Sequence, residues 1–280
     1  MRRSSAWIDR KQRRDAQSLP LVGAVALAWG LVAFFSRAVD GFHRFEFGDE
    51  SEKLVAAQLI EAGGRYYLDY VNHHGPFPYV LTHAYALLAP EWNFSGVRII
   101  PVLLVLLACW AIVTSPVLKG RTARIWAAAL FLGPIASFWV VQSLHMVNYH
   151  AIVGLLLAVV LAQLVVPAMV GERVTEGGAF AAGVATTLVC FSSISAGPTM
   201  FLLPLAATAG AVAWRWDLQQ FARVTKSHVL GILLGLTVMV SWLLAFADLK
   251  AFLVYNFYFN LAVYAGYLQH DVLDGLGLFR

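Results

Sequence analysis

Charged residues are scarce in this 280-residue chain, at 13% of the total against about a quarter in soluble domains. Hydrophobic residues make up 60%, and the mean hydropathy is +0.69. So few charged side chains are not enough to cover a water-soluble globule. The sequence therefore predicts an integral membrane protein.

Cysteine is also nearly absent, since only Cys109 and Cys190 occur and both lie inside apolar runs. This placement argues against a disulfide framework and against a thiolate metal site. The chain contains no P-loop, no G-x-G-x-x-G and no H-E-x-x-H motif, which leaves ATP hydrolysis and zinc-protease chemistry without support. We predict no cofactor, and no motif supports a divalent metal.

Long apolar runs dominate what is present. A helix needs about 20 apolar residues to cross a bilayer, and seven runs approach or reach that length: 19–38, 97–117, 123–142, 150–170, 178–195, 199–215 and 228–247. An eighth run, residues 76–90, has only 15 residues and either spans or lies at the interface. We predict an all-α fold, a polytopic membrane bundle of about seven transmembrane helices.

The distribution of positive charge decides between these topologies. With the N-terminus inside and residues 76–90 at the interface, 13 of the 20 Lys and Arg residues face inward, and 11 of the 16 acidic residues face outward. A spanning 76–90 would instead move every cation from Lys119 to Lys226 outward, against the positive-inside rule. We therefore predict a cytoplasmic basic tail, 1–18, a seven-span module, 19–247, and an outer aromatic segment, 248–280. The expected location is a bacterial inner membrane.

The first outer loop, 39–96, is too long to be an idle connection. Apolar residues at helical spacing predict a short amphipathic helix over 50–62, which Gly63-Gly64 would end. A second helix is expected over 77–89, with its apolar face at the lipid boundary. The aromatic stretch 249–268 likewise suits an outer interfacial helix.

Two adjacent carboxylates, Asp49 and Glu50, follow the first predicted span directly. A carboxylate held at the membrane surface can take the proton of an incoming hydroxyl group. Asp49 also fits a helix N-cap, with Glu52 completing a capping box, and the two roles are compatible. His73 and His74 leave metal binding, substrate contact and a structural role open. Polar residues between Gln142 and His150 can line a site.

These features resemble the GT-C membrane glycosyltransferases, which use polyprenyl-phosphate sugars and include the protein O-mannosyltransferases (glycosyltransferase family 39) and the aminoarabinose transferases. The resemblance covers almost the whole chain. It is carried by Asp49-Glu50 with the helix after it, by Gly75-Pro76-Phe77-Pro78-Tyr79, by Asn93 to Arg98 with Lys119-Gly120-Arg121, and by the aromatic run Phe252 to Tyr267.

The resemblance implies transfer of a sugar to an acceptor hydroxyl on the outer face, with inversion and release of polyprenyl phosphate. Asp49 would act as the general base beside Glu50, and His73 or His74 would approach the donor headgroup. Asn148-Tyr149-His150 stand where the family often has a second Asp, so Asn148 and His150 are candidate substrate contacts. Because the family's lysine near the turn between spans five and six is absent, phosphate binding either falls to Arg44, Arg65 or Arg280 or is missing.

The implied partners are a lipid-linked sugar donor, a glycan, lipid or protein acceptor, and membrane lipids, with no nucleic acid. Family members continue past the point where this chain ends, so it is expected to be the N-terminal seven-span module or to need a second membrane subunit. The alternative is a non-catalytic GT-C-like partner or a transporter of lipid-linked sugars. An ion-coupled transporter is disfavoured, since no charged residue lies in the core of a predicted span and no repeat is visible.

Overall fold

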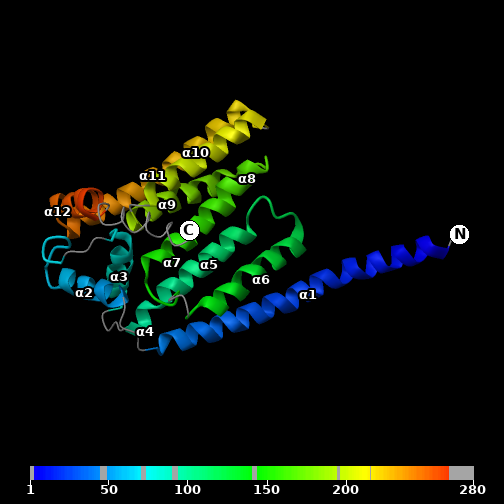
Figure 1. Ribbon diagram of the computed structural model, residues 1–280, viewed down its shortest axis with the longest axis horizontal. Coiled ribbons are helices and arrows are strands. Elements are labelled where there is room, and N and C mark those ends of the chain that lie inside the picture. Colours follow the sequence, from blue (N-terminus) through cyan, green and yellow to red (C-terminus); the bar gives the residue numbers. More distant parts are fainter. Residues whose placement is uncertain are drawn as a thin grey trace, which may run out of the picture.

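The computed structural model of the protein describes residues 3–44, 49–70, 74–89, 94–140, 144–193, 196–214 and 216–264. Within these ranges all the regular secondary structure is helical (Figure 1). Isolated β-bridges pair Tyr66 with Tyr70 and with Ala247. The predicted all-α class is confirmed for the described residues. His73 and Arg280 lie outside them.

Each of the seven predicted spans overlaps a helix. The helices are α1 (Arg3–Phe42), α5 (Ile99–Val113), α6 (Gly120–Phe138), α7 (Tyr149–Val160), α9 (Glu176–Ser192), α10 (Gly197–Trp214) and α11 (Leu218–Phe246). α7 continues through a π-helical turn, η1 (Leu161–Val165), into α8 (Val166–Met169).

Among the described residues, four helical segments are long and apolar enough to cross a membrane: Leu19–Phe42, Ser95–Val113, Tyr149–Met169 and Leu218–Phe246. Glu176–Ser192 and Thr199–Ala213 are apolar but shorter. α6 carries Arg121 and Arg124 near its start, which shortens its uncharged stretch. The structure thus supports a membrane protein with four such helices, and the count of seven remains a prediction.

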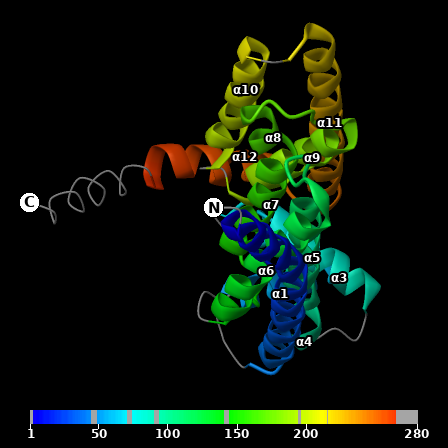
Figure 2. The same ribbon diagram turned by 90° about the vertical axis from the view of Figure 1, so that its right-hand side faces the viewer.

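Neighbouring helices pack in parallel pairs, stacked in a row in both ribbon views: α1 with α6, α5 with α7, and α9 with α11 (Figures 1 and 2). Glycines permit the closest of these contacts. A Cβ on Gly183 would collide with the His228 carbonyl oxygen, and one on Gly231 with that of Phe180. The Thr187 hydroxyl donates to the Ile232 carbonyl oxygen, 3.2 Å away. Small residues and interhelical hydrogen bonds of this kind associate helices in membranes.

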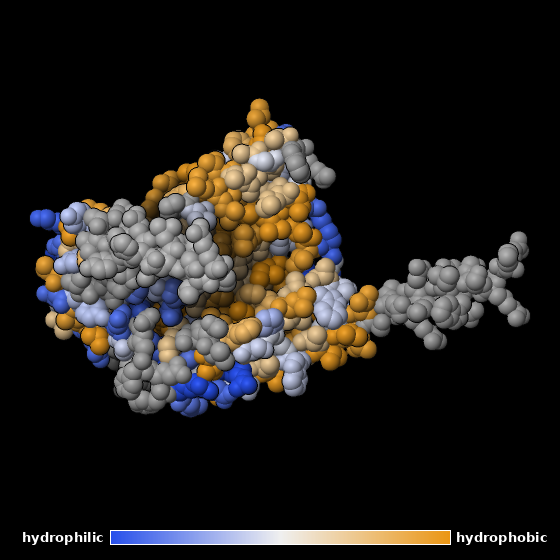
Figure 3. Space-filling model, viewed as in Figure 1, coloured by the Kyte–Doolittle hydropathy of each residue, from blue (hydrophilic) through white to orange (hydrophobic). Residues whose placement is uncertain are grey.

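Polar side chains also join the C-terminal end of α5 to η1 inside the bundle. The Gln163 amide nitrogen donates to the Ala111 carbonyl oxygen at 2.5 Å, and the Ser115 hydroxyl donates to that of Ala162 at 2.6 Å. Backbone and side-chain polar groups must find such partners because the hydrocarbon layer offers none. The surface is correspondingly apolar over much of the bundle (Figure 3), and includes exposed Leu21, Trp29 and Leu202.

Short helices gather at one end of the bundle, on the left of Figure 1: α2 (Asp49–Glu61), α3 (Phe77–Leu88), α4 (Phe94–Val97) and α12 (Leu249–Leu253), which continues into the π-helical η3 (Val254–Tyr264). We call this the α2–α3 end. The helices predicted over 50–62 and 77–89 are confirmed. The segment predicted over 249–268 is helical to Tyr264, and its remainder lies outside the described residues.

Basic connections lie at the opposite end, which we call the loop end. There the ammonium group of Lys119, before α6, lies 2.6 Å from a carboxylate oxygen of Glu172, before α9. The Trp216 indole N–H donates to the Glu172 carbonyl oxygen at 3.3 Å. The connections before α6, α9 and α11 therefore meet at one end of the bundle. The number of spans and the membrane side of each end remain predictions.

Candidate functional site

A buried ion pair organises the α2–α3 end. The Arg98 side chain donates from Nε (3.0 Å) and from Nη2 (2.9 Å) to Oε2 of Glu50. Both side chains are almost fully buried. Arg98 Nη1 also donates to the carbonyl oxygens of Gly41 (2.5 Å) and Arg44 (2.6 Å). One guanidinium group thus joins the end of α1, the start of α2 and the start of α5.

The second carboxylate oxygen of Glu50 reaches the segment before α7. Oε1 accepts a hydrogen bond from the backbone N–H of Val147 at 3.3 Å. The next residue, Asn148, caps α7 by accepting from the His150 N–H at 2.9 Å. The first outer loop and the stretch around Asn148 were both predicted as candidate site segments, and Glu50 brings them together.

His74 belongs to the same region. Its ring stacks on Tyr149, with the ring centroids 4.4 Å apart and the planes 30° from parallel. The His150 ring packs against the same tyrosine at 3.8 Å and is exposed. His74 and His150 therefore contact one aromatic side chain at the start of α7, directly after Asn148.

Asp49 begins α2 and directly precedes Glu50. Because the Glu50 side chain is fixed by Arg98 and Val147, the backbone at Asp49 is held close to the start of α7. The Asp49 side chain lies outside the described residues. Its roles as base and as N-cap both remain predictions.

The predicted phosphate-binding arginines separate in space. Arg44 has an exposed side chain, and its backbone takes part in the Arg98 contacts. Arg65 instead donates from Nη2 to the Ala247 carbonyl oxygen at 3.0 Å, at the end of α11. Its own backbone N–H donates to the Asp69 carboxylate at 2.7 Å. Of these two described arginines, Arg44 is the one beside the ion pair.

A buried aromatic cluster, which the sequence analysis did not anticipate, joins α3 to α11. Tyr66 packs against Tyr67 and Tyr79, at centroid distances of 4.2 and 4.5 Å, and against Trp242 at 6.1 Å. Burial raises the pKa of all three tyrosine hydroxyls, so they stay protonated. The repeated tyrosines 66, 67 and 70 were visible in the sequence, but nothing there links them to Trp242.

Lys53 is fully buried beside this cluster. Its ammonium group lies 5.8 Å from the centroid of Tyr79 and 3.8 Å from a carboxylate oxygen of Glu52. The Tyr79 ring face attracts the cation, and Glu52 partly balances its charge. Glu52, predicted to complete a capping box, is therefore close to Lys53.

His83, on α3, connects the cluster to α11 by a hydrogen bond. The Trp242 indole N–H donates to His83 Nδ1 at 3.1 Å. Burial lowers the pKa of His83, and the weaker opposing influence of Glu61 does not overcome it. This bond requires a neutral imidazole whose Nδ1 is unprotonated, because the imidazolium form has no acceptor nitrogen.

The described residues contain no group of three or more His, Cys, Asp or Glu side chains placed to hold a metal ion. Comparison of the chain with protein-family models, with curated proteins and with solved structures finds no match. The chemistry of the α2–α3 end therefore has to be argued from its own residues.

Proposed function

We propose that this chain is a membrane glycosyltransferase that moves a sugar from a polyprenyl-phosphate donor to an acceptor hydroxyl, with Asp49 as the general base. The proposal extends the resemblance to GT-C enzymes. The observation that carries it is the hydrogen bond between Glu50 and Val147, since this contact joins the Asp49-Glu50 turn to the segment with Asn148 and His150.

The ion pair separates the roles of the two adjacent carboxylates. Glu50 is buried, and its two carboxylate oxygens accept hydrogen bonds from Arg98 and from Val147. An acceptor hydroxyl would have to displace these partners to reach the Glu50 carboxylate. Glu50 is thus a positioning residue, and Asp49 is the carboxylate left for general base catalysis, which requires a group held in fixed geometry.

Groups that suit a phosphorylated donor lie at the same end. The Arg44 side chain is exposed beside the Arg98 contacts, and the His150 side chain is exposed at the start of α7. A guanidinium group and an imidazole N–H both donate hydrogen bonds to phosphate oxygens. In the proposed reaction these residues and His74 bind the donor headgroup, while Asp49 takes the proton of the acceptor hydroxyl.

The test is an Asp49→Asn variant assayed for transfer of labelled sugar from a polyprenyl-phosphate donor pool in proteoliposomes. Asn caps a helix about as well as Asp, so the free energy of unfolding should stay near that of the wild type. Loss of the base should lower turnover by roughly 100-fold or more. Asp69→Asn, in the same loop, is the matched control and should keep wild-type turnover.

Two results would contradict the proposal. One is unchanged turnover in Asp49→Asn, which would leave only a capping role for this side chain. The other is a wild-type chain that transfers no label above the background of empty proteoliposomes. Glu50→Gln tests the positioning role of Glu50. This variant should lower both the free energy of unfolding and the turnover.

A further inference from the structure

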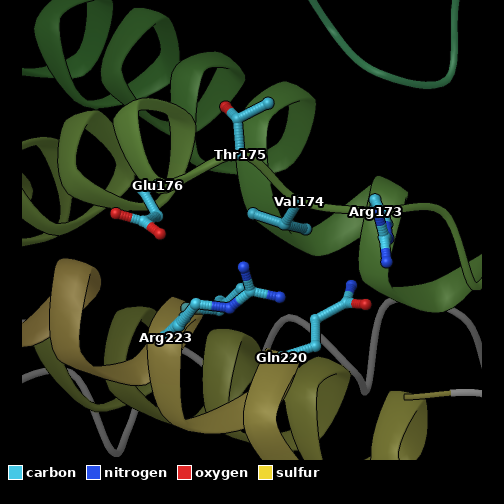
Figure 4. Close-up of a pocket in the computed structure, with 7 residues that line it drawn as sticks. Arg173, Val174, Thr175, Glu176, Gln220 and Arg223 are labelled. Atoms are coloured by element: carbon cyan, nitrogen blue, oxygen red, sulfur yellow. The ribbon is translucent and has the colours of Figure 1, made fainter. Parts of the chain in front are cut away.

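A polar cavity lies at the loop end, far from the Glu50–Arg98 pair. It has a volume of about 170 Å³ and lies between the segment that begins α9 and the first turns of α11 (Figure 4). Its lining consists of Arg173, Val174, Thr175, Glu176, Gln220, Arg223 and Val224. Arg173 and Arg223 are among the cations between Lys119 and Lys226, which the sequence analysis used only to predict the topology.

The two arginines in this cavity have no partner among the described residues. Within the part of the chain that the structure describes, neither the Arg173 nor the Arg223 guanidinium makes an ion pair or a hydrogen bond. Figure 4 shows both side chains and the Gln220 amide extending into the same space. The Gln220 amide nitrogen is buried and has no hydrogen-bond partner among the described residues. A buried donor in this state costs free energy unless a ligand accepts from it.

The segment that carries Arg173 is anchored by its neighbours. Glu172, the residue before Arg173, is fixed by the Lys119 ion pair and by the Trp216 indole N–H. Gly171 has a φ of +71°, which turns the chain sharply after α8. Arg173 therefore projects from an anchored segment, and less backbone freedom is lost when a ligand binds.

The position of the cavity points to a lipid as the source of the ligand. α11 is a candidate membrane span, and its apolar run is predicted over 228–247, so Arg223 and Gln220 lie five and eight positions before that run. At a helical rise of about 1.5 Å per residue, the cavity lies at the level of the lipid headgroups beside the hydrocarbon layer. Basic pockets between transmembrane helices at this level suit anionic lipid headgroups, and guanidinium groups bind phosphate oxygens through paired hydrogen bonds.

From these observations we propose that the cavity binds the phosphate of an anionic phospholipid, with Arg173, Arg223 and the Gln220 amide as donors. The Glu176 carboxylate also lines the cavity and opposes an anion. It limits the affinity and favours a singly charged phosphodiester over a more highly charged monoester. This site is independent of the proposed transferase function.

The test compares purified variants by native mass spectrometry after reconstitution with phosphatidylglycerol and phosphatidylcholine. Each arginine should contribute binding free energy through charged hydrogen bonds to the phosphate. Arg173→Gln and Arg223→Gln should therefore each lower retention of phosphatidylglycerol about tenfold. Glu176→Gln should raise it. Arg121→Gln, which removes an exposed cation outside the cavity, is the matched control and should retain the lipid. A cooperative thermal unfolding transition, measured for each variant in phosphatidylcholine, verifies that it is folded.

Equal loss of phosphatidylglycerol in Arg121→Gln and in the cavity variants would overturn the proposal, because general surface charge would then explain binding. Retention that is unchanged in Arg173→Gln and Arg223→Gln would overturn it as well. A second experiment adds inorganic phosphate to the protein in detergent, at constant ionic strength, and measures the melting temperature. If phosphate alone raises the melting temperature of the wild type but not of Arg223→Gln, and no lipid is retained, the ligand is a soluble phosphate and the lipid source is wrong.

Discussion

Glu50 and Arg98 are 48 positions apart in the sequence, yet Arg98 Nη2 lies 2.9 Å from Glu50 Oε2 in a pair that is almost wholly shielded from solvent. Arg98 binds the end of α1 through the Gly41 carbonyl oxygen, and Glu50 binds the segment before α7 through Val147. Four parts of the chain depend on these two side chains. The loss of either charge should therefore destabilise the whole α2–α3 end.

Arg98→Met should lower the free energy of unfolding by about 3–5 kcal/mol, because it leaves the Glu50 charge buried without its counterion. Arg37→Met is the matched control, since the Arg37–Asp40 pair is exposed and should be worth less than about 1 kcal/mol. Unfolding by SDS in mixed micelles measures the free energy of unfolding of both variants. The double variant Glu50→Gln/Arg98→Met should recover part of the loss, and an Arg98→Met chain as stable as Arg37→Met would refute this account.

Gly231→Ala should destabilise the α9–α11 pair. The added methyl group would meet the Phe180 carbonyl oxygen, so the helices would have to separate, at a cost of about 1–3 kcal/mol or more. Gly154→Ala, in α7, meets no atom within 4 Å and should be neutral or stabilising by up to about 1 kcal/mol through its helix propensity. Thermal unfolding in detergent compares the two. Similar melting temperatures for both variants would show that α9 and α11 do not pack this closely.

His83 should make stability fall in mild acid. Its pKa in the folded chain lies below the ordinary 6.5, so the unfolded chain binds more protons as the pH falls below that value. Stability from this group is complete above about pH 6.5 and is lost as the pH drops toward the folded pKa. His83→Gln keeps an acceptor for Trp242 without titrating, so its melting temperature should depend less on pH.

The topology can be checked with single cysteines in a chain lacking Cys109 and Cys190. Gln58, in α2, and Gln219, at the start of α11, are both exposed glutamines and lie at opposite ends of the bundle. The positive-inside rule places Gln58 outside and Gln219 inside. A membrane-impermeant thiol reagent added to intact cells should label Gln58→Cys and leave Gln219→Cys unlabelled until the cells are opened. The reverse pattern would invert the topology.

The sequence by itself determined the helical elements of this protein. Apolar runs of bilayer length predicted the long helices, because burying the backbone in lipid requires helical hydrogen bonds. Local spacing was enough for α2 and α3, since a helical face and its stop signal are both short-range. α2 ends at Glu61, and Gly63 has the positive φ of +89° expected of a glycine that ends a helix.

Only the tertiary structure decided which residues meet. The Glu50–Arg98 pair, the Trp242–His83 hydrogen bond and the convergence of Arg173 with Arg223 each join segments distant in the sequence. Periodicity assigns a residue to a face of its own helix, but the partner of that face depends on how all the helices pack. Gly231 shows the physical reason: its place in an apolar run predicted a span, whereas its contact with the backbone of α9 follows only from the close approach of the two helices.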